Sequence, residues 1–187
     1  IALLAMSEHG DSLELLSAEL RNDEAVVREA GENSPYAALI HGNERFRNDE
    51  DFVIDMIKRD SSAAEAISER LLDDDDFMQR MMAELQDGDV LMYGSERLRS
   101  QKQLAVLALS YQDTLAATVL ARLSPALQDD AGIVLVAVSN DYRALEHASE
   151  RLRAEKFVCL EAIKSVQSHL RSRASPLQFM SPALRND

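Results

Sequence analysis

Apolar residues recur along this chain at helical spacing, in blocks that keep the same internal order. Each block is anchored on one large apolar residue, and successive anchors are separated by 26, 25, 27, 29, 25 and 32 residues. The anchors are Leu20, Phe46, Leu71, Leu98, Leu127, Leu152 and Leu184. Self-similarity at such a period is typical of tandem helical repeats. Positions below are numbered from the anchor, so that +6 lies six residues after it.

A short helix is expected before each anchor, because positions −7, −4 and 0 fall on one face at helical spacing. Position −3 is Ser in six blocks and Asn43 in the other. We expect the short helix to end near this residue. Position −7 holds Leu13, Leu39, Ala64, Leu91, Leu120, Leu145 and Leu177.

A second helix of about 8–12 residues is expected after the anchor. Positions +6, +7, +10 and +11 are apolar in nearly every block and form a broad stripe, with Gly31 as the exception. Acidic and amide side chains such as Asp23 and Asp49 precede the stripe, where they can cap the first free amides of a helix. Helices this short are marginal alone, so they must pack on neighbours.

This pattern predicts an all-α fold, an α-solenoid or superhelical stack of short helical hairpins with about 25–27 residues per repeat. Residues 1–187 are expected to form a single tandem-repeat domain of about six full units plus partial units at both ends. Residues 169–175 are predicted to be an insertion, a longer helix or a loop. Because the chain opens at Ile1 and stops within the recurring phrase at Asp187, we expect a fragment of a longer protein.

The composition agrees with helices and narrows the range of partners. Aromatic residues make up 5% of the chain, Trp is missing, and only 6 Gly and 4 Pro interrupt it. The net charge of −13 repels phosphate backbones, so no nucleic-acid partner is expected. The longest apolar stretch, residues 131–138, is far too short to span a bilayer, so no membrane insertion is expected.

Candidate catalytic and metal-binding residues fit structural roles better than chemical ones. Cys159 occupies the +7 position shared with valines, which indicates a buried small apolar residue. The Ser at −3 recurs because of helix-end geometry, whereas a catalytic Ser would be single and paired with a base. The acidic run 73–76 lacks the order of a calcium-binding loop and resembles the helix caps of other blocks. The four His show no metal-ligand spacing. We therefore expect no catalytic residue, no metal site and no cofactor.

Position −5 is the best candidate for a binding surface, because it varies freely while the core positions stay apolar. Plain packing is the simpler interpretation of such a column, and a recognition ridge is the alternative. Aromatic and Arg anchors dominate contact energies in protein interfaces. The candidate binding residues are His41, Tyr93, Arg122, His147 and Phe179; Leu15 and Ala66 complete the column.

The phrase L-x-x-A-S-E-x-L-R-x-D followed by an apolar helix is clearest in residues 91–109 and 145–163. It resembles a bacterial helical repeat family catalogued as domain of unknown function 4116, and the resemblance runs through nearly the whole chain. Gln101 and Pro125 depart from the pattern. The resemblance implies long multi-repeat proteins of host-associated bacteria, some of them effector-like. It implies no known activity, cofactor or catalytic residue.

These observations favour a non-catalytic protein-interaction or scaffolding module of a bacterial, effector-like protein, with a protein or peptide as partner. A structural spacer or accessory domain beside a catalytic domain is the alternative. An enzyme would need a polar cleft of singular residues, which the sequence does not offer. The expected location is cytoplasmic, or inside a host cell after translocation. The sequence leaves the partner's identity and the oligomeric state open.

Overall fold

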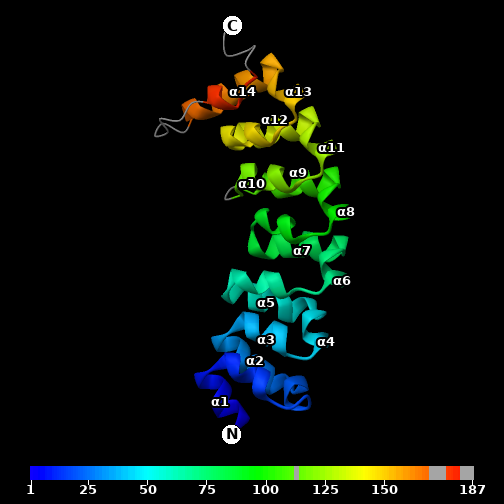
Figure 1. The fold of residues 1–187 in the computed structure, drawn as a ribbon, viewed down its shortest axis with the longest axis vertical. Helices are drawn as coiled ribbons and strands as arrows, with labels where there is room; N and C mark the ends of the chain where they lie inside the picture. The colour runs from blue at the N-terminus through cyan, green and yellow to red at the C-terminus, as the bar shows by residue number, and fades with distance from the viewer. Residues whose placement is uncertain (112–113, 169–175, 182–187) are drawn as a thin grey trace. The chain divides into compact units, whose positions relative to one another are not determined.

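The computed structural model describes residues 1–111, 114–168 and 176–181, and within these residues it contains helices and no β-strand (Figure 1). The all-α prediction is therefore confirmed for the described part of the chain. The chain divides into two compact units, which we call the N-terminal unit (residues 1–81) and the C-terminal unit (residues 82–187). The single domain expected from the sequence stays a prediction, and the two units are described separately below.

Three helical segments, rather than the expected two, lie in each block. A first helix of 4 to 7 residues ends at position −5, a one-turn helix carries the anchor, and a longer α-helix of 9 to 13 residues follows. The first helices are η1 (Gly10–Leu15), α3 (Pro35–His41), η3 (Ser61–Ala66), η4 (Asp89–Tyr93), α10 (Ala116–Arg122), η5 (Tyr142–His147) and η6 (Pro176–Phe179), where η marks a 3₁₀ helix.

The one-turn helices are η2 (Leu20–Asn22), α4 (Glu44–Arg47), α6 (Glu69–Leu72), α8 (Glu96–Arg99), α11 (Pro125–Gln128) and α13 (Glu150–Arg153). The longer helices are α2 (Glu24–Asn33), α5 (Glu50–Arg59), α7 (Asp75–Leu85), α9 (Lys102–Ser110), α12 (Ala131–Asn140) and α14 (Lys156–Ser168). Helix α1 (Ala2–Glu8) precedes them, and the boundary between the two units falls within α7.

The recurring Ser at −3 caps the one-turn helix instead of ending the first helix. The Oγ atoms of Ser68, Ser95 and Ser149 accept hydrogen bonds from the anchor N–H groups three residues on, at 3.3, 3.3 and 3.2 Å. An Oγ in this place satisfies one of the amides that a helix start leaves without an intrahelical partner. The structural interpretation of these Ser is therefore confirmed. The first helix ends two residues earlier than the Ser, at position −5.

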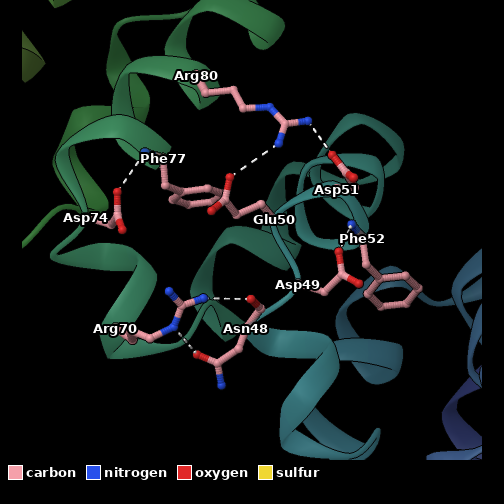
Figure 2. Close-up of polar contacts among 9 residues, drawn as sticks. All are labelled: Asn48, Asp49, Glu50, Asp51, Phe52, Arg70, Asp74, Phe77 and Arg80. Carbon is pink, nitrogen blue, oxygen red and sulfur yellow. Dashed lines mark hydrogen bonds and ion pairs between the residues drawn. The ribbon is translucent and has the colours of Figure 1, made fainter.

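Aspartates at position +3 cap the longer helices in the same way. Asp23, Asp49, Asp74 and Asp130 each accept a hydrogen bond from the N–H of residue +6, at 3.1, 3.0, 3.0 and 3.1 Å. Asp74 is the second residue of the acidic run 73–76, and its bond to Phe77 is drawn in Figure 2. Helix capping thus accounts for this member of the run, as predicted.

The predicted core positions are buried. Positions +6, +7, +10 and +11 of the six longer helices are buried throughout except at Ile163, which is half-buried. The anchors from Phe46 to Leu152 are buried, and Leu20 is half-buried. The register read from the sequence therefore holds for the described blocks. The last anchor, Leu184, and the predicted insertion 169–175 lie outside the described residues.

Leu177 is the one position −7 residue that was assigned wrongly to the core. Its exposed fraction is 47%, whereas Pro176 and Met180 are buried. The first helix of this block has only four residues and starts at Pro176, so a different face of it points inward. This helix lies within the longest interval between anchors, from Leu152 to Leu184. The register of the earlier blocks does not extend to it.

Within each unit the helices of one class lie beside one another. In the N-terminal unit, α3 packs against η1, η3, α2 and α5. In the C-terminal unit, α12 contacts both α9 and α14, and the three follow one another in Figure 1. Helix α10 contacts η4 and η5, and η5 contacts η6. The C-terminal unit thus has one row of first helices and one row of longer helices.

Candidate functional site

Each candidate binding residue is the last residue of a first helix. Tyr93, Arg122, His147 and Phe179 end η4, α10, η5 and η6 in the C-terminal unit. These four helices contact one another in that order and form one row. Each of the four residues lies at the C-terminal end of its helix. His41 ends α3 in the N-terminal unit. The four C-terminal residues are called the −5 ridge below.

Burial along position −5 is mixed. Arg122 is exposed, whereas Tyr93, His147 and Phe179 are half-buried, as is His41. A half-buried side chain packs with one edge and presents the other to solvent. The C-terminal unit therefore exposes aromatic, imidazole and guanidinium groups along the −5 ridge. The two interpretations of this column, packing and recognition, both stay open.

The strongest sequence signal, the recurring Ser-Glu-Arg phrase, has a structural explanation. The Arg at position −1 reaches back to the preceding block and donates a hydrogen bond to a main-chain carbonyl oxygen there. Arg45 Nη2 lies 2.8 Å from the Asn22 oxygen, and Arg70 Nη2 lies 2.7 Å from the Asn48 oxygen. Figure 2 shows the second pair, in which Arg70 Nε also donates to the Asn48 side chain at 2.9 Å. These arginines tie successive blocks together.

The same tie recurs in the C-terminal unit with an acidic partner. Arg151 Nη2 donates to the Asp129 carbonyl oxygen at 2.8 Å, and its Nε donates to the Asp129 carboxylate at 3.0 Å. The Ser149 hydroxyl also contacts this carboxylate. The hydrogen bond from the Ser149 hydroxyl, and then the one from Arg151, lower the pKa of Asp129. The Arg at position −1 is visible in the sequence. Its repeated occurrence together with an Asp or Asn at position +2 of the preceding block was the signal that could have predicted the contact.

Charged side chains link the outer faces of the longer helices in the N-terminal unit. Arg80 on α7 donates to Glu50 Oε2 at 3.3 Å and also contacts Asp51, both on α5 (Figure 2). Arg59 on α5 pairs with Glu32 on α2 and, at 3.2 Å, with Asp55 on its own helix. The hydrogen bond that Arg59 donates to Glu32 is the main cause of the raised pKa of Arg59.

The outer face of the longer helices in the C-terminal unit carries exposed apolar residues. Val106 on α9, Val136 on α12, and Phe157 and Leu160 on α14 have exposed fractions of 46, 39, 47 and 48%. The half-buried Leu107 and Leu135 lie at positions +9 and +8 of the same row. We call these six residues the apolar face: Val106, Leu107, Leu135, Val136, Phe157 and Leu160.

Sequence reasoning missed the apolar face because it considered the inward stripe alone. The available signal was α12, whose residues from 133 to 138 are apolar on every side. A helix that is apolar all round is usually covered on all sides. In this structure α12 is covered on its inner side and by its neighbours, while Val136 remains 39% exposed.

The net charge of the chain is distributed very unevenly between the two units. Residues 1–81 contain 20 acidic and 8 basic residues, a net charge of −12. Residues 82–187 contain 13 acidic and 12 basic residues, a net charge of −1. The repulsion of anionic partners expected from the whole chain therefore belongs mainly to the N-terminal unit.

Groups with chemical potential are held in structural arrangements. Cys159 is buried, burial raises the pKa of its thiol, and the Sγ donates a hydrogen bond to the Arg153 carbonyl oxygen at 3.4 Å. A raised pKa disfavours the thiolate, which is the reactive form. Burial, and then the neighbouring Asp87, raise the pKa of Asp89, while the N–H of Leu115 donates to that carboxylate at 3.0 Å.

Across residues 1–111, 114–168 and 176–181, no three His, Cys, Asp or Glu side chains are grouped so that they could hold a metal ion. None of the helices in that part of the chain is both long and apolar enough to cross a membrane. The absence of a metal, a cofactor and a catalytic site stays a prediction, and His169 lies outside the described residues.

Comparison with known proteins finds a match to one family. The family model described as Domain of unknown function (DUF4116) matches residues 130–185, from the N-terminal end of α12 to near the end of the chain. The match confirms the resemblance for this segment. Neither the curated proteins nor the solved structures contain a significant match to the chain.

Proposed function

We propose that this chain, whose residues 130–185 match the model of the family Domain of unknown function (DUF4116), is a non-catalytic protein-interaction or scaffolding module. In this proposal its blocks are tandem repeats of an α-solenoid, and the −5 ridge binds a segment of a protein or peptide partner. The observation that carries the proposal is the row formed by η4, α10, η5 and η6, which end at the four ridge residues.

The contrast between the core and the ridge supports this proposal. Inward positions hold the same kind of apolar residue in every block, because the geometry of the stack requires it. Position −5 is free of that requirement and holds Tyr93, Arg122, His147 and Phe179 in the C-terminal unit. Stacked helical repeats offer extended surfaces on which such variable positions select a partner. Aromatic and Arg side chains are the residue types that contribute most to such contacts.

The test is capture of partners from host and bacterial lysates with the full 187-residue chain as bait. A triple variant, Tyr93→Ala, Arg122→Ala and His147→Ala, should lose the captured protein because it removes three neighbouring anchors of the ridge. A matched triple variant at exposed polar positions elsewhere in this unit, Gln103→Ala, Ser110→Ala and Ser139→Ala, should retain it. Circular dichroism should show the same helical signal for both variants.

Two outcomes would contradict the proposal. Undiminished capture by the ridge variant would place the site elsewhere, and empty capture by the unmodified chain would favour the spacer function. The spacer alternative is supported by the arginine ties of Arg45, Arg70 and Arg151, which would stiffen an array of blocks. A catalytic domain encoded beside these blocks in the full-length gene would favour it. Bacterial origin, effector-like activity and a cytoplasmic or host-cell location are parts of the proposal that rest on the family resemblance.

A further inference from the structure

The apolar face lies on one row of contacting helices. Helix α12 contacts α9 on one side and α14 on the other, so its residues Leu135 and Val136 lie between those of its neighbours. Val106 and Leu160 both occupy position +8, the position of Leu135 on α12. Residues at the same position of adjacent helices in a row face the same way. The six side chains therefore form a continuous surface, separate from the −5 ridge.

The charged side chains beside this surface have partners within the chain. The remaining outward positions of α9 and α12 hold the uncharged residues Gln103, Ser110, Gly132 and Ser139. Lys102 lies 2.6 Å from Asp130, and Lys164 lies 3.1 Å from Glu161. Lys156, next to Phe157, also has an interaction partner. A surface that is apolar in the middle, with charged neighbours that have partners in their own chain, suits a second copy of itself, because pairing would bury no unpartnered charge.

The size of the apolar face fits the centre of a modest interface. From the exposed fractions of its members, it presents on the order of 400 Å² of accessible surface, within the range of functional patches on soluble proteins. A standard interface buries about 800 Å² on each partner, with an apolar centre and a polar rim. The apolar face would supply the centre, and the neutral polar residues around it would supply the rim.

We infer that the apolar face of α9, α12 and α14 is a self-association surface, through which two copies of this chain pair face to face about a two-fold axis. Such a pairing is isologous, so the same patch is used on both copies. Burial of Val136, Phe157 and Leu160 from water drives the association. A small interface of this kind is typical of weak, reversible association.

The first measurement is sedimentation equilibrium of the full chain from about 1 µM to about 500 µM, a range in which weak dimers form and dissociate. The expected result is a reversible monomer–dimer equilibrium. A chain that stays monomeric over the whole range overturns the inference, and a helix of another protein would then be the better candidate for covering the surface.

The second measurement locates the surface with matched variants. The double variant Val136→Lys and Leu160→Lys should raise the dissociation constant about a hundredfold, because two ammonium groups per copy would have to be desolvated. The control is Tyr36→Lys and Leu3→Lys, whose parent side chains in the N-terminal unit are 40% and 48% exposed, against 39% and 48% for Val136 and Leu160. The control should dimerise like the unmodified chain, and equal loss in both variants would overturn the location.

Salt dependence separates apolar pairing from electrostatic pairing. Each copy carries a net charge of −13, so two copies repel one another at low ionic strength. Raising the salt concentration from about 20 mM to about 500 mM screens this repulsion and leaves apolar burial intact. The dimer should therefore become tighter with salt. A dimer that weakens with salt would contradict apolar pairing. These variants leave the −5 ridge unchanged. Loss of partner capture at the ridge and loss of self-association at the apolar face are therefore separate outcomes.

Discussion

The longer helices of the two compact units share an inner face and differ on the outer one. In both units, positions +6, +7, +10 and +11 are apolar and buried, with Gly31 and the half-buried Ile163 as the exceptions. On the outer face of the N-terminal unit, Arg80 and Arg59 pair with acidic residues of neighbouring helices. On the outer face of the C-terminal unit, Val106, Val136 and Leu160 are exposed to solvent.

This difference teaches that the recurring pattern specifies the fold and leaves the outer face free for other roles. Ion pairs between exposed side chains contribute little to stability, typically about 0–1 kcal/mol each, so they are dispensable for folding. An apolar residue on the outer face, such as Val136 at the position that Arg80 holds in its own block, keeps the core and creates a surface that gains from being covered. The net charge of the whole chain, −13, does not reveal this contrast between the units, because residues 1–81 carry a net charge of −12.

The largest expected effect tests whether the two units share one kind of core. Leu152→Ala in the C-terminal unit and Leu71→Ala in the N-terminal unit should each destabilise the fold by about 2–5 kcal/mol, because each empties a fully buried anchor site. Urea unfolding followed by circular dichroism measures the loss. If either change proved harmless, the anchor register of that unit would be wrong, and the comparison would lose its common core.

A smaller effect tests the role of the Ser at −3. Ser149→Ala should cost about 1 kcal/mol, since Oγ accepts the Leu152 N–H and contacts Asp129. Ser124→Ala is the matched control, because its Oγ is buried without a hydrogen-bond partner among the described residues and does not cap α11. The control should leave the free energy of unfolding almost unchanged. Equal losses at both positions would show that capping is not the role of this Ser.

The outer faces themselves can be compared by salt dependence. Arg80→Gln should cost no more than about 1 kcal/mol at low ionic strength, and the loss should shrink in about 1 M salt, because solvent-exposed pairs are screened. Val106→Gln is the control on the other unit and should show no such salt dependence, since no ion pair is removed. Denaturant unfolding at the two salt concentrations, with dilute protein, measures both. A salt-independent loss at Arg80 would mean that packing of its alkyl chain matters more than its charge.

The smallest effect concerns pH. Lys102 first, and then the N–H groups at the start of α12, lower the pKa of Asp130 below its ordinary value of 3.8. A lowered folded-state pKa stabilises the fold above the ordinary value, and this contribution is lost as the pH falls through the lowered one. Asp130→Asn keeps the capping oxygen and removes the charge. The variant should therefore lose less than about 1 kcal/mol at pH 7 and match the unmodified chain at a pH near 2. A loss that persists in acid would assign the effect to geometry and not to charge.

The core could be predicted from the sequence because each of its residues is specified by a local rule that the chain repeats. Helical spacing places Val134 and Cys159 inward without any knowledge of their neighbours, and both are buried. The one-turn helices escaped prediction, although their Ser caps were visible, because four residues are too few to show helical periodicity. Leu177 was assigned wrongly because the register was extended across the longest interval, where no repeated position constrains it.

The sequence alone determined the all-α class, the period of the blocks, the inward stripe and the burial of the single Cys, because these follow from spacing along one chain. Only the tertiary structure decided which residues of different blocks become neighbours. It placed the helices that end at Tyr93, Arg122, His147 and Phe179 in one row, and it paired Arg80 with Glu50. It also left Val136 open to solvent on an otherwise apolar helix. Exposure and pairing depend on what packs alongside, and that information arises only when separate segments meet.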